Sequence, residues 1–223
     1  MSAAQLSIYR EVYQSQLGPF ELRIESTSEL YQVKMSNAGL ETVGHNILMR
    51  RMYPPTEWLP SMYNIETATA WIFHITKRNS SQEQLTCRIE TVRSALQGGS
   101  ETGENLIAIG FEDGVRQLHI GTEDEDAMAC RANCNDWMPP RLKPLLSSYY
   151  LPITEASASG LKTTIPILQP GEQFYFHYIV AENPYRTSLD YPDEPDISTW
   201  YAVNQQKHQL EKLWQVEIQK PRP

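Results

Sequence analysis

Apolar and polar residues alternate over much of this 223-residue chain, and a period of two is typical of β-strands. The alternation predicts strands within residues 20–26, 30–37, 66–79 and 84–92. In ETATAWIFHITKRN (66–79) both sets of alternating positions are largely apolar. We therefore expect other parts of the chain to cover that strand on both faces.

Two turn signals predict further strands. Asp113-Gly114 separates two alternating runs in 106–122 and can adopt the positive φ angles of a tight turn, which predicts a β-hairpin. A Pro-Gly turn precedes the aromatic run FYFHYIV (174–180), which we expect to be a central strand. The stretch LQPGEQFYFHYIV (168–180) is similar to patterns seen in immunoglobulin-like sandwiches, and this resemblance favours a sandwich over a barrel.

Helical spacing occurs near both ends of the chain. Residues 6–17 favour a short helix, although SIYREVYQ within them also alternates as a strand does. Near the other end, residues 198–214 predict a helix that begins with a Ser or Thr cap. Its apolar positions at helical intervals are Trp200, Val203, Leu210, Leu213 and Trp214.

The segment TEDEDAMACRANCNDW (122–137) predicts a helix that begins with four acids. Negative side chains are favoured there by the unpaired amides of the first turn, with Thr122 or Asp124 as the cap. Spacings of three and four then place one set of side chains on a single face, which we expect to be buried. This set comprises Ala127, Cys130, Cys134 and Trp137.

These elements predict a mainly β protein, with α+β as an alternative. We expect an antiparallel, sandwich-like core with a helix after a central hairpin and a C-terminal helix. Residues 1–223 are interpreted as a single domain, and SALQGGSETGEN marks a possible sub-division near 94–105. Three loops rich in proline and aromatic residues, 52–62, 137–152 and 184–197, are expected on the surface.

Composition narrows the class of function. A net charge of -8 argues against nucleic acid as a partner, because binding to the phosphate backbone needs clustered Lys and Arg. No apolar run is long enough to cross a membrane, and the first residues lack the pattern of a secretory signal. Three cysteines do not make a disulfide framework. We expect a cytoplasmic protein with reduced thiols.

The sequence offers three candidate reactive sites. Cys130 and Cys134 could bind zinc together with His119 and either Cys87 or His74, but the sequence has no second Cys pair, and neither a metal nor a cofactor is predicted. A thiol redox pair is disfavoured by the adjacent acids. The strand histidines His74, His119 and His177 could converge in a pocket, although structural histidines are the commoner case. The common nucleotide-binding and hydrolase motifs are absent from the sequence.

The sequence therefore favours a non-catalytic protein-binding module, such as an inhibitor, immunity, assembly or adaptor protein. Its partner would be a basic protein that meets an acidic surface with aromatic anchors. The predicted binding residues are Asp190, Tyr191, Asp193, Glu194, Asp196 and Trp58. The alternative is a small-ligand-binding protein or a hydrolase-type enzyme with a histidine and carboxylate site, so catalysis stays open.

Overall fold

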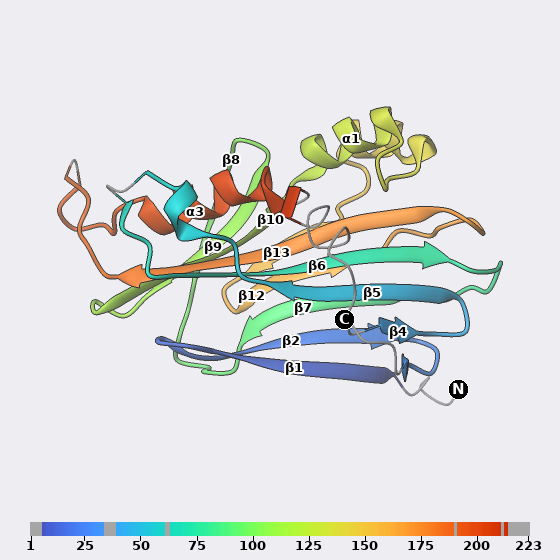
Figure 1. Ribbon diagram of the computed structural model, residues 1–223, viewed down its shortest axis with the longest axis horizontal. Coiled ribbons are helices and arrows are strands. Elements are labelled where there is room, and N and C mark those ends of the chain that lie inside the picture. Colours follow the sequence, from blue (N-terminus) through green and yellow to red (C-terminus); the bar gives the residue numbers. More distant parts are fainter. Residues whose placement is uncertain (1–5, 34–38, 61–62, 190, 211, 214–223) are drawn as a thin grey trace.

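The computed structural model describes residues 6–33, 39–60, 63–189, 191–210 and 212–213. Its strands form two antiparallel sheets that pack face to face (Figure 1). The five-stranded sheet has the order β1 (Ser7–Ser15), β2 (Gly18–Ser26), β7 (Leu85–Thr91), β12 (Gly160–Thr164) and β11 (Thr154–Ser157). The eight-stranded sheet has the order β3 (Tyr31–Val33), β4 (Gly39–Glu41), β5 (His45–Met52), β6 (Thr67–Lys77), β13 (Gln173–Pro184), β10 (Arg116–Glu123), β9 (Leu106–Glu112) and β8 (Gly99–Gly103).

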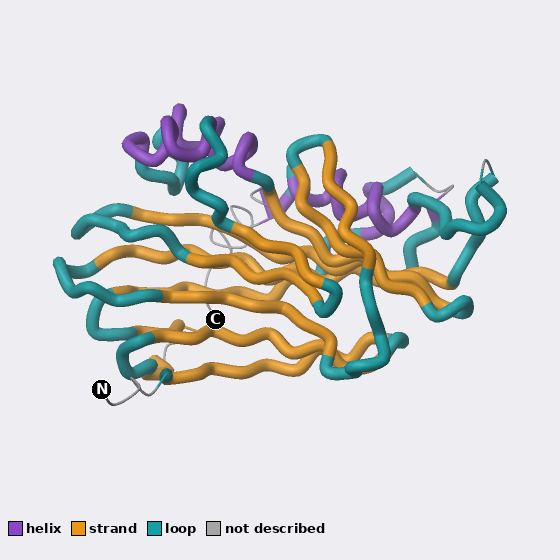
Figure 2. The backbone as a smooth tube through the Cα atoms, turned by 180° about the vertical axis from the view of Figure 1, so that it is seen from behind, coloured by secondary structure: helices purple, strands orange, loops and turns teal. Residues whose placement is uncertain are grey.

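Helix α3 (Ser198–Lys207) lies on the outer side of the eight-stranded sheet, whereas the other helices bury residues in the main core cluster (Figure 2). The other helices are α1 (Glu125–Cys134) and α2 (Lys143–Ser147), and the 3-10 turns are η1 (Thr56–Trp58) and η3 (Pro140–Leu142). The predicted mainly β, sandwich-like architecture is confirmed, as are the helix after the central hairpin and the helix near the C-terminus. The stretch 94–105 contains β8, the edge strand of the larger sheet.

The main core lies between the two sheets. β13 is an inner strand of the larger sheet, as its aromatic content predicts, and one of its faces carries Phe174, Phe176 and Tyr178 into this core. Phe176 stacks on Phe73 of β6 with ring centroids 4.3 Å apart. The Tyr178 hydroxyl crosses to the smaller sheet and donates to the Cys87 carbonyl at 3.0 Å, so its burial leaves no unpaired donor.

A second apolar cluster covers the outer face of the larger sheet. Ala70 and Ile72 of β6 pack there with Ala202 and Val203 of α3, which explains why both faces of β6 are apolar. Gly121 of β10 permits this approach, since a Cβ atom there would lie 2.6 Å from Val203 Cγ1. Helix α3 therefore docks closely against the sheet.

The N-terminal helix prediction for 6–17 is wrong. Residues 7–15 form β1, which pairs with β2 from Ser7↔Ser26 to Ser15↔Gly18. The alternation in SIYREVYQ turns Tyr9 and Tyr13 toward the core, and pairing with a long neighbouring strand outweighs a weak helical period. The loop prediction for 137–152 also needs correction, because η3 and α2 bury Leu142 and Leu146 in the core.

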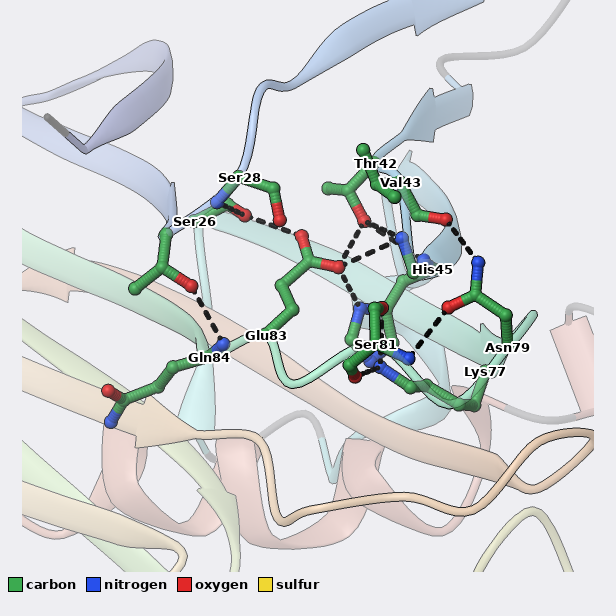
Figure 3. A network of polar contacts seen from close by, with 12 residues as sticks. Ser26, Ser28, Thr42, Val43, His45, Lys77, Asn79, Ser81, Glu83 and Gln84 are labelled. Carbon is green, nitrogen blue, oxygen red and sulfur yellow. Dashed lines mark hydrogen bonds and ion pairs between the residues drawn. The ribbon is translucent and has the colours of Figure 1, made fainter. Parts of the chain in front are cut away.

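A buried polar network ties the sheets together at the end where β6 finishes. The Glu83 carboxylate lies between Ser26 of β2 and the Thr42–His45 turn of the other sheet (Figure 3). It accepts hydrogen bonds from Ser26 Oγ (2.7 Å), Thr42 Oγ1 (2.8 Å), the Gly44 amide (3.0 Å) and His45 Nδ1 (2.9 Å). With its side chain 1% exposed, Glu83 acts here as a structural link.

Candidate functional site

A pocket of about 490 Å³ opens at the other end of the sandwich, along the seam between the two sheets. We call it the seam pocket. Its walls come from the end of β1 and the following turn, the end of β5, the segment 53–57, the start of β6 with the preceding Glu66, and Glu182 of β13. The predicted surface loop 52–62 therefore supplies one wall of this pocket.

Arg51 is the single cation among the residues that line the seam pocket, and it is already engaged. Its guanidinium carbon lies 5.5 Å from the ring centroid of Tyr13, 5.4 Å from that of Tyr53 and 5.3 Å from that of Trp71. Its Nη1 lies 3.4 Å from Glu11 Oε1, which also accepts a bond from the Trp71 indole. Cation–π contacts and this ion pair hold Arg51 in place.

Three carboxylates line the same pocket: Glu57, Glu66 and Glu182. Glu57 is exposed and Glu66 pairs with Arg116, whereas Glu182 is only 3% exposed and accepts the Gln16 amide at 2.7 Å. Burial raises the pKa of Glu182 above its ordinary value, and the Glu66 carboxylate raises it further. The pocket thus combines a surplus of carboxylates with aromatic and proline walls.

Four of the predicted binding residues belong to the described part of the loop after β13: Tyr191, Asp193, Glu194 and Asp196. Backbone bonds from Ser188 to Glu194 (2.8 Å) and from Asp196 to Arg186 (2.7 Å) fix the base of this loop. Tyr191 is 64% exposed, and Asp193 and Glu194 are exposed. Asp190 and the side chain of Trp58 lie outside the described residues.

Asp196 is used within the protein. Its carboxylate lies 3.1 Å from Arg186 Nε and accepts bonds from Gln117 Nε2 (2.6 Å) and the Ser198 amide (3.1 Å). It thereby supports the start of α3, whose N-cap position holds Ile197 and not the predicted Ser or Thr. Asp196 orders the loop, whereas the exposed acids at 193 and 194 are available to a partner.

We call the loop after β13, which carries Tyr191, Asp193 and Glu194, the acidic loop. It lies at the same end of the molecule as the seam pocket and projects at the left of Figure 1. Arg186 of the loop donates to the Tyr63 carbonyl, close in sequence to Glu66 of the pocket. The Tyr185 amide donates to the Val115 carbonyl at the tip of the β9–β10 hairpin. The loop is therefore anchored to the segments that flank the pocket.

The strand histidines form no open site. His74 packs against Trp137, His177 bonds to the Tyr175 hydroxyl at 3.0 Å, and His119 bonds to Thr199 Oγ1 at 2.7 Å. All three are buried. Burial lowers the pKa of both His74 and His177 to about 4, so both are neutral at pH 7.

The predicted orientation of α1 is wrong. Asp124 caps the helix by accepting the Ala127 amide at 3.0 Å, as expected, but Cys130 and Cys134 are exposed. The buried side of α1 carries Met128, Ala129 and Ala132, which pack in the core cluster that includes residues of η3 and α2. The sequence pattern correctly placed Cys130 and Cys134 on one face of the helix. It could not show that the proline-interrupted segment 138–147 packs on the opposite face and leaves the two cysteines exposed.

The zinc alternative is not supported by the arrangement of the described side chains. In the described ranges, no group of three or more His, Cys, Asp or Glu residues is placed to hold a metal ion. Cys87 is buried between the sheets, while Cys130 and Cys134 lie on the exposed face of α1. Burial raises the pKa of the Cys87 thiol far above its ordinary value, which makes it unreactive.

Comparison with known proteins adds no family: no protein-family model and no curated protein matches this chain. Within the part of the chain that the structure describes, no helix has the length and apolar character to cross a bilayer. Sequence reasoning missed Glu66, Glu182 and Arg51 as candidate site residues. These residues lie in separate strands or at their ends, and only the sheet packing brings them to one pocket.

Proposed function

We propose that this protein is a non-catalytic binding module that recognises a basic protein partner with the end that holds the seam pocket. The observation that carries the proposal is the charge of the pocket: three carboxylates line it, one of which (Glu66) is paired with Arg116, and its one cation, Arg51, is paired with Glu11. A cationic side chain of the partner would enter the pocket. Asp193, Glu194 and Tyr191 of the neighbouring loop would contact the residues around it.

The pocket suits an arginine or lysine side chain in two ways. The exposed Glu57 supplies negative charge at its surface, and Tyr53, which is 69% exposed, supplies an aromatic face. Glu66 also lines the pocket, where it is paired with Arg116. Desolvated charge pairs and aromatic anchors are common features of protein interfaces. The surrounding acids would also speed the encounter with a basic surface.

A cation in the pocket would also change the state of Glu182. Its raised pKa reflects burial and the nearby Glu66 carboxylate, so a positive charge there would lower it. Binding would therefore release protons over the pH range in which free Glu182 is partly protonated. The partner would bind more tightly as pH rises through that range.

We propose a cytoplasmic location and a protein as the partner, in agreement with the expectations from the sequence. Cys87, Cys130 and Cys134 are free, and two of them are exposed, which supports a compartment that keeps thiols reduced. The net charge of -8 supports a basic protein over nucleic acid. The partner is defined by its basic surface.

A fluorescent arginine-rich peptide tests the proposal by anisotropy with the full chain. We expect binding that weakens with salt, and a two- to five-fold weaker affinity for Glu57→Gln, since one exposed ion pair contributes about 0.5–1 kcal/mol. Glu155→Gln is the matched control, because Glu155 is exposed but pairs with Lys162 away from the pocket. No binding at low salt, or equal weakening in both variants, would contradict the proposal.

A further inference from the structure

Helix α1 and the end of α3 border a second cavity of about 330 Å³, which we call the interhelical cavity. Ala127, Cys130, Arg131 and Cys134 line it from one face of α1, and Lys207 and His208 line it from α3 and its C-cap. Both thiols are exposed, although free cysteine is among the residue types most often buried. The two thiols thus face one cavity from adjacent turns of one helix.

The spacing of the two thiols disfavours a disulfide. Residues four apart on a helix have Cβ atoms about 5–6 Å apart, whereas a disulfide needs about 3.5–4.5 Å. The N-cap at Asp124 and the left-handed C-cap at Asn135 (φ 52°) fix the two ends of α1, which opposes the distortion that an S–S bond would need. The pair therefore remains a dithiol unless the helix unwinds.

The same spacing suits a metal ion between the sulfur atoms. Two metal–sulfur bonds of about 2.3 Å each let a linear S–M–S unit span about 4.6 Å, within reach of thiols on adjacent turns. Thiolates select copper(I), zinc and iron–sulfur clusters. Zinc sites take three or four protein ligands and the clusters take four, so a pair of thiolates favours copper(I). A two-ligand site also agrees with the absence of any three-ligand group among the described residues.

We propose that Cys130 and Cys134 bind one copper(I) ion in the interhelical cavity. Two S–H bonds break and two S–Cu bonds form, two protons pass to solvent, and the metal keeps its oxidation state. The resulting bis-thiolate unit carries one negative charge. This site is independent of the seam pocket.

Lys207 can offset the charge of this unit. Lys207 lines the cavity, and its ammonium group donates to the neutral Glu104 carbonyl. Glu123 and Asp136 also line the cavity, but both carboxylates are paired with Arg131, at 2.6 Å and 2.8 Å. Lys207 is 2% exposed, so its charge is little screened by water. The lining of the cavity thus includes a buried cation as well as the two cysteines.

Competition with a chromophoric copper(I) chelator tests the site on the reduced full chain. The wild type and Cys87→Ala should each remove one copper(I) per chain, and Cys130→Ser and Cys134→Ser should each remove none. Circular dichroism should show that the serine variants are folded, because both side chains are exposed. The site is disproved if the wild type removes no copper, if either folded serine variant still removes one ion, or if folded Cys87→Ala removes none.

A second measurement requires no substitution. Iodoacetamide should alkylate Cys130 and Cys134 in the reduced wild-type chain, and one equivalent of copper(I) should protect both, as peptide mass spectrometry can show. Alkylation that copper(I) does not slow at these two positions would overturn the assignment. Release of about two protons per ion, followed in weakly buffered solution, gives an independent check on the stoichiometry.

Discussion

Removal of the Glu83 carboxylate should strongly destabilise the sandwich. The variant Glu83→Ala deletes the acceptor of four hydrogen bonds, from Ser26, Thr42, Gly44 and His45. At about 1 kcal/mol of net stabilisation for each bond, the loss is about 4 kcal/mol. For a domain of this size each kcal/mol lowers Tm by roughly 2–4 °C, so Tm should fall by roughly 8–16 °C.

Urea denaturation followed by tryptophan fluorescence measures this loss. Glu155→Ala is the matched control, because that carboxylate is exposed and its pair with Lys162 should contribute less than about 1 kcal/mol. Glu83→Gln should lie between the wild type and Glu83→Ala, because its amide keeps one acceptor oxygen but also presents two donors. A loss below about 1 kcal/mol in Glu83→Ala would refute the assigned role of the network.

The stability that Glu83→Ala loses relative to the wild type should depend on pH. Burial alone would raise the pKa of Glu83, but hydrogen bonds from Ser26 and Thr42 and the charge of His45 outweigh it, so the pKa is lowered. A carboxyl whose folded pKa is lowered stabilises the protein above its unfolded pKa of about 4.3, and this contribution disappears as pH falls through the folded value. The difference in the free energy of unfolding between the wild type and Glu83→Ala should therefore decrease at acidic pH.

Three further predictions concern the core, the histidines and the seam pocket. Phe176→Ala should cost about 3–5 kcal/mol in urea denaturation, because Phe176 is fully buried and stacks on Phe73; a loss below about 1 kcal/mol would contradict this packing. By NMR, the His74 and His177 rings should stay neutral until pH approaches about 4, and titration above pH 6 would show that they are not buried as described. Burial raises the pKa of Glu182, so the folded state favours its protonated form, and Glu182→Gln should be more stable than wild type at pH 7 but not at pH 3; an equal difference at both pH values would count against a raised pKa.

The strands could be read from the sequence where local and tertiary preferences agree. The Asp113-Gly114 turn forms the predicted hairpin, with Gly114 at φ 79°, and β13 alternates as expected. Residues 7–15 were ambiguous, because their periodicity fits both a helix and a strand until β2 is known to lie alongside. Pairing between strands is not visible in a local window.

The candidate sites were less predictable than the fold. The exposed acids at 193 and 194 could be anticipated, because a proline-rich polar loop must lie at the surface. The helical face of Cys130 and Cys134 was also recognisable, but its exposure depends on where the segment 138–147 packs. The seam pocket had no local signal, since Arg51 and Glu182 meet only through the packing of two sheets.

The most direct test of the proposed function is to map the arginine-rich peptide on the isotopically labelled full chain by NMR. We predict that the largest salt-sensitive shifts of backbone amides occur at Tyr53, Glu57, Glu66 and Glu182, with smaller shifts at Tyr191 and Glu194. Shifts spread evenly over the acidic surface, or concentrated on α1, would contradict it.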